Sequence, residues 1–449
     1  MNFVAPKRIK IDKKIDTKFS PFEIYCKINE NFGTSFLLES REGKRKLARF
    51  SFIGFEPSHI LKANSKFLTI NDKKIICKDP LLELRSIVSK KFGIRSGFLG
   101  GAVGYITYDY VRSIETIPNT TKDEFKFPDF EFGIFQDCLV FNHRKNELRY
   151  LSCDKNRLPL IKKIIHKETN NSNLEIGKIK ANMSKRRFEN IVSKSKEYIK
   201  SGDILQVVLS RRYKFSFKGN LIEFYKNLRK INPSPYMYYI KFGKRQIIGT
   251  SPENLVRVEG KKIDSYATIA GTRHRGKTKA EDKKLEKELL SDKKERAEHL
   301  MLVDLTRNDI GKVSSFGSVK VPEFMQVYKF SHVQHIVSRV AGKLNNHDCF
   351  DVFKSIFPAG TVSGAPKIRA MEIIEELEPA KRGPYAGAVG YFSFNGNADF
   401  AITIRSLFAN DNKAFIQVGA GIVYDSIPER EFFETENKAK ALLKALKGD

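Results

Sequence analysis

Short stretches of alternating hydrophobic and polar residues dominate the first third of the chain. The runs TSFLLES, RFSFIGF and GGAVGYITYDYV combine β-branched and aromatic residues, and they lie next to Gly, Pro or Asn. This pattern is typical of strands separated by turns. The first third therefore predicts an α+β fold, and not a parallel α/β fold.

The hydrophobic spacing changes to that of a helix after a polar stretch, Thr169 to Asn173. Ser184 can cap this helix and Gly202 can end it. The positions at helical spacing between them are Phe188, Ile191, Val192, Ser195 and Ile199. The polar stretch is the candidate boundary between an N-terminal region, residues 1–165, and a second region, residues 180–445.

The rest of the second region continues with both kinds of pattern. Strands are predicted after the first helix, followed by a long charged helix around residues 280–304 and a Gly-rich turn into a helix at 359–377. Three strand-like runs at 386–424 come before a closing helix that starts near Pro428.

One short string occurs twice. GAVGY is found at residues 101–105 and again at 387–391, both times within a Gly-rich alternating strand. Five identical residues are compatible with chance, and also with an old duplication in which both halves contribute related sheets. The sequence leaves both explanations open.

The composition adds a strong positive charge. Among 449 residues there are 81 Lys or Arg and 52 Asp or Glu, which gives a formal net charge of +29. Such a charge makes nucleic acid the first partner to consider. The Lys residues are spread along the whole chain, often beside Glu or Asp, and no nucleic-acid module is found. A Lys-rich surface without a nucleic-acid partner is therefore predicted.

Cysteine usage and the N-terminus bear on location. The cysteines are odd in number and not closely paired, so neither a disulfide framework nor a Cys-based zinc site is predicted: Cys26, Cys77, Cys138, Cys153 and Cys349. The N-terminus lacks the apolar stretch of a signal peptide, and no run approaches the roughly 18 residues of a membrane span. We expect a soluble cytoplasmic protein. Trp is absent, although there are 35 Phe and 16 Tyr.

Two pairs of carboxylates are candidates for a metal site. Glu295 and Glu298 lie on one predicted helix, and Glu431 and Glu434 lie on another. Residues three positions apart share a helix face, so each helix can offer two carboxylates to one point. Oxygen donors without Cys or His suit a hard cation such as Mg²⁺. Solvated surface charges would show the same spacing, although the apolar run HLMLVDL directly after Glu298 argues against a fully exposed face.

The string FPAGTVSGAPKIRAMEIIEEL, residues 357–377, is a second candidate. Its glycines free the backbone and a helix begins at about Pro366, so the turn could present N–H groups to an anion. The nucleotide P-loop pattern is excluded, because Gly360 and Gly364 are too close together and Lys367 is followed by Ile. An ordinary turn explains the string equally well.

Single polar residues give weaker signals. A structural role would explain each of them alone: Glu253 in GTSPE, His332 and His335 in SHVQH, Tyr385 before a glycine, and Arg405 in AITIRSL. In an extended run His332 and His335 would point to opposite faces, so a two-histidine metal site is not predicted.

Taken together, the strings closely resemble the chorismate-utilising enzymes, and within them the anthranilate synthase component I family. GDILQVVLSRR, NPSPYMYYI, GTSPENLVRV, IAGTRHRG, KERAEHLMLVDLTRND, FPAGTVSGAPK, GAVGYFSF and GAGIVYDSIPEREFFETENKAKA occur in this order. The resemblance covers roughly residues 20–445. It implies an α+β body, a large sandwich of two antiparallel sheets flanked by helices, with the active site between them.

Two positions separate the relatives within that group. Isochorismate and salicylate synthases carry a Lys base just before VVLS, where this chain has Gln206. Aminodeoxychorismate synthases typically carry a nucleophilic Lys where this chain has Ala270, which leaves room for ammonia. The resemblance thus implies amination of chorismate at ring carbon 2 and then loss of pyruvate. The alternative is aminodeoxychorismate synthase component I, and a basic nucleic-acid-binding protein is the non-enzyme alternative.

The resemblance implies Mg²⁺ as the cofactor. Glu298 and Glu434 would ligate the ion, and Glu295 and Glu431 would support it through water. The ion would hold the ring carboxylate of chorismate and neutralise its charge.

Substrate binding is implied for a second set of residues. Arg405, assisted by Tyr385, would clamp the enolpyruvyl carboxylate, because a guanidinium fork fits a planar carboxylate. The ring carboxylate would meet the side chain of Lys438 and the backbone of Gly419, Ala420 and Gly421.

The resemblance also implies three residues near the reacting atoms. Thr361 would lie near the C4 hydroxyl, and Glu253 would be the general acid that protonates this hydroxyl as it leaves, which requires a raised pKa. His335 is the candidate for the later elimination of pyruvate.

Ammonia would come from a separate glutamine amidotransferase subunit, since no GxCxG-type motif surrounds any cysteine. Tryptophan would be a feedback inhibitor at a distant site. FLLES at 36–40 resembles the regulatory segment, where Glu39 and Ser40 would receive the ammonium group. The indole would lie against the second segment, NPSPYM, through Pro233, Ser234, Pro235, Tyr236 and Met237.

Overall fold

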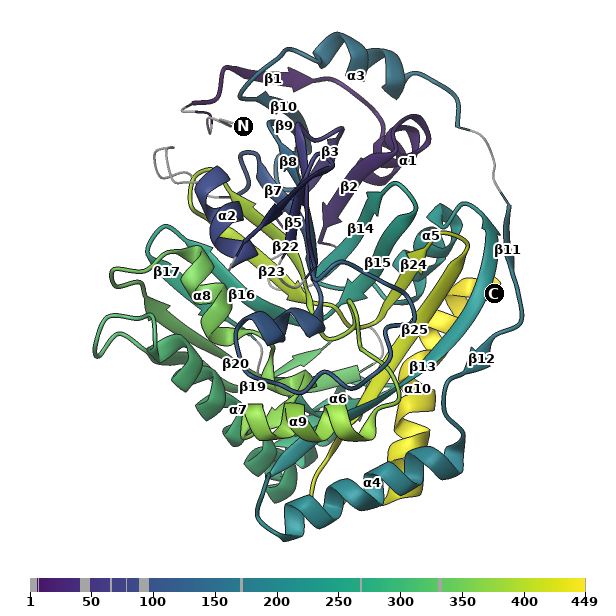
Figure 1. Cartoon of the computed structure of the whole chain (residues 1–449), viewed down its shortest axis with the longest axis vertical. Helices are drawn as coiled ribbons and strands as arrows, with labels where there is room; N and C mark the ends of the chain where they lie inside the picture. The colour runs from purple at the N-terminus through teal and green to yellow at the C-terminus, as the bar shows by residue number, and fades with distance from the viewer. Residues whose placement is uncertain are drawn as a thin grey trace.

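Two large antiparallel sheets form the body of the chain, with helices outside them (Figure 1). The computed structural model describes residue 6 and residues 8–40, 49–64, 67–77, 79–88, 97–169, 173–266, 269–329 and 333–448. The predicted α+β class with two antiparallel sheets is confirmed. Residues 170–172 of the predicted boundary lie outside the described residues, and the division into two regions stays a prediction.

In the described part of the chain the first sheet has 13 strands. Its main path runs, from edge to edge, through β1 (Ile11–Ile15), β10 (Glu147–Ser152), β9 (Asp137–Asn142), β3 (Phe50–Phe55), β2 (Thr34–Glu39), β14 (Tyr236–Phe242), β15 (Arg245–Ser251), β24 (Ser406–Asn410), β25 (Lys413–Ile422), β13 (Gln206–Gly219) and β11 (Leu174–Ile176). Two short strands also pair with β13, namely β12 (Lys180–Ala181) and β21 (Gly364–Ala365).

The second sheet has 12 strands among the described residues. Its path runs through β18 (Ile269–His274), β20 (Val333–Lys343), β17 (Lys262–Ser265), β16 (Asn254–Glu259), β23 (Ala398–Ile402), β22 (Ala388–Ser393), β7 (Gly101–Ile106), β8 (Phe130–Phe135), β4 (His59–Asn64), β5 (Phe67–Ile70) and β6 (Lys73–Ile76), with β19 (Lys320–Lys329) beside β20. Both sheets therefore contain strands from the N-terminal third and from the rest of the chain.

The two copies of GAVGY lie side by side in the second sheet. Strand β7 is antiparallel to β22, and Gly104 is opposite Gly390. A Cβ atom on Gly104 would lie 2.0 Å from the carbonyl oxygen of Glu131, and one on Gly390 would lie 2.0 Å from that of Asp399. Glycine is needed at both positions because a side chain would collide with backbone. This pairing leaves both origins of the repeat open.

Helices cover the outer faces of the sheets (Figure 1). They are α1 (Pro21–Asn31), α2 (Pro80–Ile87), α3 (Leu158–Ile165), α4 (Lys185–Lys200), α5 (Ile222–Ile231), α6 (Lys279–Ser291), α7 (Lys293–Gly311), α8 (Cys349–Ile356), α9 (Lys367–Leu377) and α10 (Pro428–Lys447), with 3₁₀ turns η1 (Tyr108–Ser113) and η2 (Gly360–Val362). No helix in the described ranges is long and apolar enough to cross a membrane.

Alternate residues of the first sheet enter two different apolar cores, because successive side chains of a strand point to opposite faces. Phe36 packs toward the second sheet, where its ring lies 4.7 Å from that of Phe135. Tyr239 packs on the other face, 5.3 Å from Tyr25 of α1 and 5.7 Å from Tyr225 of α5. The first sheet is thus buried on both faces.

Local signals placed some of the helices correctly. Ser184 caps α4 as predicted, since its hydroxyl accepts a hydrogen bond from the backbone N–H of Arg187. The single charged helix predicted around residues 280–304 is wrong. Asp292 ends α6 and caps α7 through its carboxylate, which accepts the N–H of Lys294 at 3.0 Å, so the chain forms two helices there.

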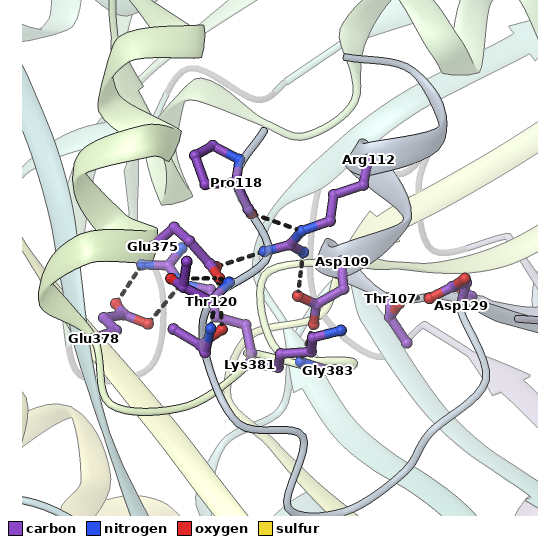
Figure 2. A network of polar contacts seen from close by, with 12 residues as sticks. Thr107, Asp109, Arg112, Pro118, Thr120, Asp129, Glu375, Glu378, Lys381 and Gly383 are labelled. Carbon is purple, nitrogen blue, oxygen red and sulfur yellow. Dashed lines mark hydrogen bonds and ion pairs between the residues drawn. The ribbon is translucent and has the colours of Figure 1, made fainter. Parts of the chain in front are cut away.

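Figure 2 shows a group of polar contacts that ties the segment after β7 to α9. Arg112 donates hydrogen bonds to Asp109 at 2.6 Å and to Glu375 at 2.5 Å. The Glu375 carboxylate also accepts the backbone N–H groups of Thr120 at 2.6 Å and Thr121 at 2.8 Å. Glu375 is only 7% exposed, so this acidic side chain depends on these donors.

We expect Glu375→Gln to lower the free energy of unfolding by about 2–4 kcal/mol, because the amide cannot replace the charge opposite Arg112 and brings a donor where donors already converge. Chemical denaturation measures the change. Glu376→Gln is the matched control on the same helix, since Glu376 is exposed and accepts only the Tyr198 hydroxyl among the bonds the structure gives it. A control loss as large as that of Glu375→Gln would contradict the prediction.

Candidate active site

Two of the predicted site residues, Glu253 and Arg405, lie where the chain passes from one sheet to the other. Glu253 stands between β15 of the first sheet and β16 of the second, and Arg405 stands between β23 of the second and β24 of the first. The backbone N–H of Thr250 donates to the Arg405 carbonyl at 3.2 Å, and that of Ile402 donates to the Glu253 carbonyl at 3.1 Å. The two crossings therefore hold each other in place.

Burial changes the acidity of Glu253. Its side chain is 5% exposed, and removal from water raises the pKa of the carboxyl to about 7, against the opposing effects of Thr361 and Arg405. The Thr361 hydroxyl donates to the carboxylate at 2.6 Å. A carboxyl of this kind keeps its proton close to neutral pH and can act as a general acid.

Arg405 is held in a strained conformation beside Glu253. Its φ angle is 50°, in the left-handed region that non-glycine residues rarely adopt. Its guanidinium donates to the Asn232 side-chain carbonyl at 3.4 Å, and the Asn232 amide group donates to the Thr250 hydroxyl at 2.9 Å. Burial lowers the pKa of the guanidinium, while the charge of Glu253 raises it. Strain of this kind clusters at functional sites.

His335 is a neutral imidazole in β20. Its Nδ1 lies 3.0 Å from the carbonyl oxygen of Gly271, which can only accept, so Nδ1 carries the proton and Nε2 is the acceptor nitrogen. Burial and the charge of Arg405 lower its pKa to about 4. Ala270 lies on the neighbouring strand, where its backbone pairs with Ile336. His332 lies outside the described residues.

Lys438 of α10 links the parts of the site. Its ammonium group donates to the Gly419 carbonyl at 2.9 Å and pairs with Glu434 at 2.7 Å. Its charge also helps to lower the pKa of Glu253 and of His335. Helix α10 therefore places a cation near Glu253, the glycine segment of β25 and the predicted metal ligands.

The glycines of β25 make room for neighbouring polar groups. A Cβ atom on Gly419 would lie 2.7 Å from the Tyr385 hydroxyl, and one on Gly421 would lie 2.8 Å from the Gln206 amide nitrogen. Ala420 between them is fully buried in an apolar cluster on the other face. The Gln206 amide, at the start of β13, donates to the Glu298 carboxylate at 3.0 Å. The paired strands β13 and β25 are therefore adjacent to a predicted metal ligand.

The four predicted metal ligands lie on α7 and α10 and influence one another. Burial raises the pKa of Glu298, and the charges of Glu295 and Glu434 raise it further. Burial also raises the pKa of Glu431, with a contribution from Glu434. Glu434 pairs with Lys438, and Glu295 pairs with Arg273 at 3.2 Å. The described residues contain no group of three or more His, Cys, Asp and Glu side chains arranged to hold a metal.

The carboxylates nevertheless fit a hard divalent cation in kind. Two helices direct acidic side chains at one region, and the repulsion between them is what raises the pKa of Glu298 after burial. A bound Mg²⁺ would relieve that repulsion, and it prefers such oxygen donors.

The predicted tryptophan-binding segments line a cavity of about 690 Å³ that contains none of the catalytic candidates. Glu39 and Ser40 contribute from the end of β2, and Pro235, Tyr236 and Met237 from the start of β14. These strands are paired, with Met237 opposite Glu39, which explains why two segments so far apart in sequence meet. Pro233 and Ser234 do not line this cavity.

Polar groups at this cavity differ in how well they are paired. The Glu39 carboxylate accepts Arg229 at 2.5 and 3.0 Å and the Tyr225 hydroxyl at 2.8 Å. The Ser40 hydroxyl is buried and makes no hydrogen bond within the described residues. An orphaned buried hydroxyl on a cavity wall is suited to a polar ligand group.

Sequence reasoning missed several residues of these sites. Asn232 opens the NPSPYM string, yet only the fold directs its side chain to Arg405. Asp399 and Arg257 line the cavity and bind each other, and Asp399 accepts the Tyr236 hydroxyl at 2.9 Å. Nothing in their local sequence distinguishes them from surface charges, so no signal was available.

Comparison with known proteins identifies the group to which this site belongs. The family model of chorismate binding enzymes matches residues 33–444. Anthranilate synthase component 1 of Methanothermobacter marburgensis is 50% identical over 451 residues, covering 99% of this chain and 96% of that protein. The same protein of Saccharolobus solfataricus is 46% identical over 428 residues, covering 95% of this chain and 97% of that one.

Solved structures agree with this assignment. Anthranilate synthase component I of Streptococcus pneumoniae superposes with a TM-score of 0.81 at 38% identity, over 90% of this chain and 95% of that one. The menaquinone-specific isochorismate synthase of Escherichia coli, at 19% identity and a TM-score of 0.75 over 99% and 96% of the two chains, shares the fold. The chain is therefore an enzyme that acts on chorismate, and it belongs to the chorismate-binding enzyme family, among the anthranilate synthase component 1 proteins.

Proposed function

We propose that the chain is the large subunit of a Mg²⁺-dependent anthranilate synthase, inhibited by tryptophan and supplied with ammonia by a glutamine amidotransferase partner. The observation that carries the chemistry is the buried Glu253 carboxyl, with a pKa of about 7, bonded to Thr361 and facing the charge of Arg405. The test is to incubate the chain with chorismate, Mg²⁺ and an ammonium salt and to measure anthranilate. Formation of aminodeoxychorismate instead would identify the folate-pathway alternative.

The first step is a substitution on the chorismate ring. Ammonia forms a bond to ring carbon 2 while the bond from C4 to its hydroxyl breaks, and Glu253 gives its proton to the hydroxyl, which leaves as water. Thr361 donates a hydrogen bond to the Glu253 carboxyl, which would orient it, and would contact the same hydroxyl of the substrate. Gln206 has no basic group, which disfavours activation of water in place of ammonia.

The second step releases pyruvate. The aminated ring loses the proton of carbon 2, the bond between the ring and the enolpyruvyl oxygen breaks, and the ring becomes aromatic. The enolpyruvyl group that leaves takes up a proton and becomes pyruvate. His335 is the candidate for assisting this elimination, because its imidazole is neutral and Nε2 can accept a proton.

Two cations and a glycine segment would hold the substrate's carboxylates. Arg405 and Tyr385 would bind the enolpyruvyl carboxylate. The hydrogen bond from Arg405 to Asn232 already directs the guanidinium, which would reduce the ordering needed when chorismate binds. Lys438 and the backbone of residues 419–421 would meet the ring carboxylate, where the absence of side chains at both glycines permits close approach.

Mg²⁺ would be held by Glu298 and Glu434, with Glu295 and Glu431 in support through water. When bound, the ion would neutralise the negative charge of the ring carboxylate. Lys438 pairs with Glu434 and the Gln206 amide donates to Glu298, so these partners would have to share the two carboxylates with the ion.

Ammonia and tryptophan would complete the enzyme's partners. The relatives are named component 1, which supports a second component, and we assign the release of ammonia from glutamine to it. Tryptophan would occupy the cavity lined by the end of β2 and the start of β14, where Ser40 and Glu39 would receive its ammonium group and Pro235, Tyr236 and Met237 would contact the indole.

The pH dependence tests the role of Glu253. A general acid must be protonated, so at a constant concentration of free ammonia we expect kcat/KM for chorismate to fall as the pH rises through about 7, by about tenfold per unit above it. Total ammonium is adjusted at each pH to keep free ammonia constant. Glu253→Gln should lose at least about a hundredfold in kcat and this upper limb as well. Retention of the limb in the variant would show that another group donates the proton.

Charge removal tests the metal site. Glu434→Gln should abolish turnover and weaken the stabilisation of the protein by Mg²⁺ in thermal unfolding, because a ligand charge is lost while side-chain volume is kept. Glu429→Gln is the control on the same helix, since Glu429 pairs with Lys185. Near-normal activity and an unchanged response to Mg²⁺ in Glu434→Gln would exclude the assignment.

The absence of Trp from the chain gives a direct test of regulation. Bound tryptophan would be the only indole in the sample, so its emission should shift on titration, and anthranilate formation should fall. Ser40→Phe, which fills the cavity, should abolish both effects, whereas Ser234→Ala should change neither, because Ser234 does not line the cavity. Equal inhibition of Ser40→Phe and the unsubstituted protein would refute this site.

A further inference from the structure

A buried ion pair lies behind the proposed substrate site. Arg382 is 2% exposed and Glu378 is 4% exposed. Arg382 donates to the two oxygens of Glu378 at 3.0 and 2.6 Å. None of the roles assigned above uses this pair, although removing two charges from water is costly unless each is fully bonded.

The pair holds β13 at two positions. Arg382 donates to the carbonyl of Val208 at 2.6 Å. Glu378 accepts both the backbone N–H and the hydroxyl of Ser210 at 2.8 Å. In the antiparallel register Val208 is opposite Gly421 and Ser210 is opposite Gly419. The ion pair therefore holds β13, the strand hydrogen-bonded to the glycine segment of β25 that is proposed to bind the ring carboxylate.

The same guanidinium reaches two further parts of the site. It donates to the carbonyl of Val362 at 2.7 Å, the residue directly after Thr361. It also lies 5.7 Å from the centre of the Tyr385 ring and 4.7 Å from that of Tyr108, the first residue of η1. Arg382 thus contacts three segments that are far apart in sequence, namely η1, β13 and η2.

The loop that carries Arg382 is anchored in turn from the N-terminal third. The Asp109 carboxylate accepts the backbone N–H of Gly383 at 2.7 Å and pairs with Arg112 (Figure 2). Helix α9 supplies the other anchor, because Glu375 lies one turn before Glu378 on the same chain segment and binds Arg112.

We propose that Arg382, held by Glu378, is a positioning residue that fixes Thr361, Tyr385 and the glycine segment relative to one another. It contacts no reacting atom. A guanidinium presents its donors in fixed directions, so it can set the angles between several acceptors, which the single ammonium group of lysine cannot. Misplacement of catalytic groups by about 1 Å can slow a reaction about a hundredfold. The inference rests on the proposed function, since it concerns that site.

The test compares two Arg→Lys variants in buried pairs. Arg382→Lys should lower kcat/KM for chorismate at least about 50-fold, mostly in kcat. It should also move the upper limb of the pH profile to higher pH, because loosening Thr361 weakens the hydrogen bond that lowers the pKa of Glu253. Arg245→Lys is the control. Arg245 binds Glu131, which is fully buried, at 2.7 Å through two nitrogens, yet it contacts none of the three segments.

The possible results distinguish failure of the proposed function from failure of the positioning role of Arg382. If the unsubstituted protein makes no anthranilate, the proposed function fails. If it does, and folded Arg382→Lys keeps normal kcat/KM and the normal pH profile, positioning by Arg382 is refuted. Equal losses in Arg382→Lys and Arg245→Lys would refute it as well, since the effect would then be general. Should Arg382→Lys not fold, Glu378→Gln decides, with an expected loss of about tenfold and the same pH shift; normal kinetics there would refute the proposal.

Discussion

The backbone hydrogen bonds between the crossing at Glu253 and the crossing at Arg405 join the two sheets at the point where the proposed chemistry takes place. Each crossing connects a strand of one sheet to a strand of the other. Neither crossing can therefore move without disturbing both sheets. A carboxyl and a guanidinium are thereby held close together although they are far apart in sequence. The scaffold supplies the geometry before any ligand arrives, which is the condition for efficient positioning.

Burial at this junction also shifts the pKa values of Glu253 and His335 in opposite directions. The same loss of water raises the pKa of Glu253 to about 7 and lowers that of His335 to about 4. One group is thus a proton donor near neutral pH and the other is a neutral acceptor. Arg405 and Lys438 keep a positive potential over both, which suits a substrate with two carboxylates.

The sequence predicted the elements better than the site. Cap residues and spacing located α4 and α10 because these signals act within a few residues. Around Asp292 the charged residues predicted one continuous helix, but Asp292 ends α6 and caps α7. The carboxylate pairs of α7 and α10 were visible from spacing. Glu253 and Arg405 gave only weak signals as single residues, because their proximity comes from sheet crossings. Only the resemblance of long motifs implied their roles. Arg382 gave no signal, since its acceptors are carbonyl groups that any residue carries.

The pairing of β2 with β14 and of β7 with β22 has a consequence for how such an enzyme could be built or divided. The cavity-forming strand of the N-terminal third is an interior strand of a shared sheet, and not an edge to which a separate module was attached. Cutting the chain near the polar stretch at 169–173 would leave both halves with long unpaired strand edges, which associate indiscriminately. The cavity and the candidate active site therefore belong to one folded unit, and neither can be transplanted to another scaffold by joining chain ends.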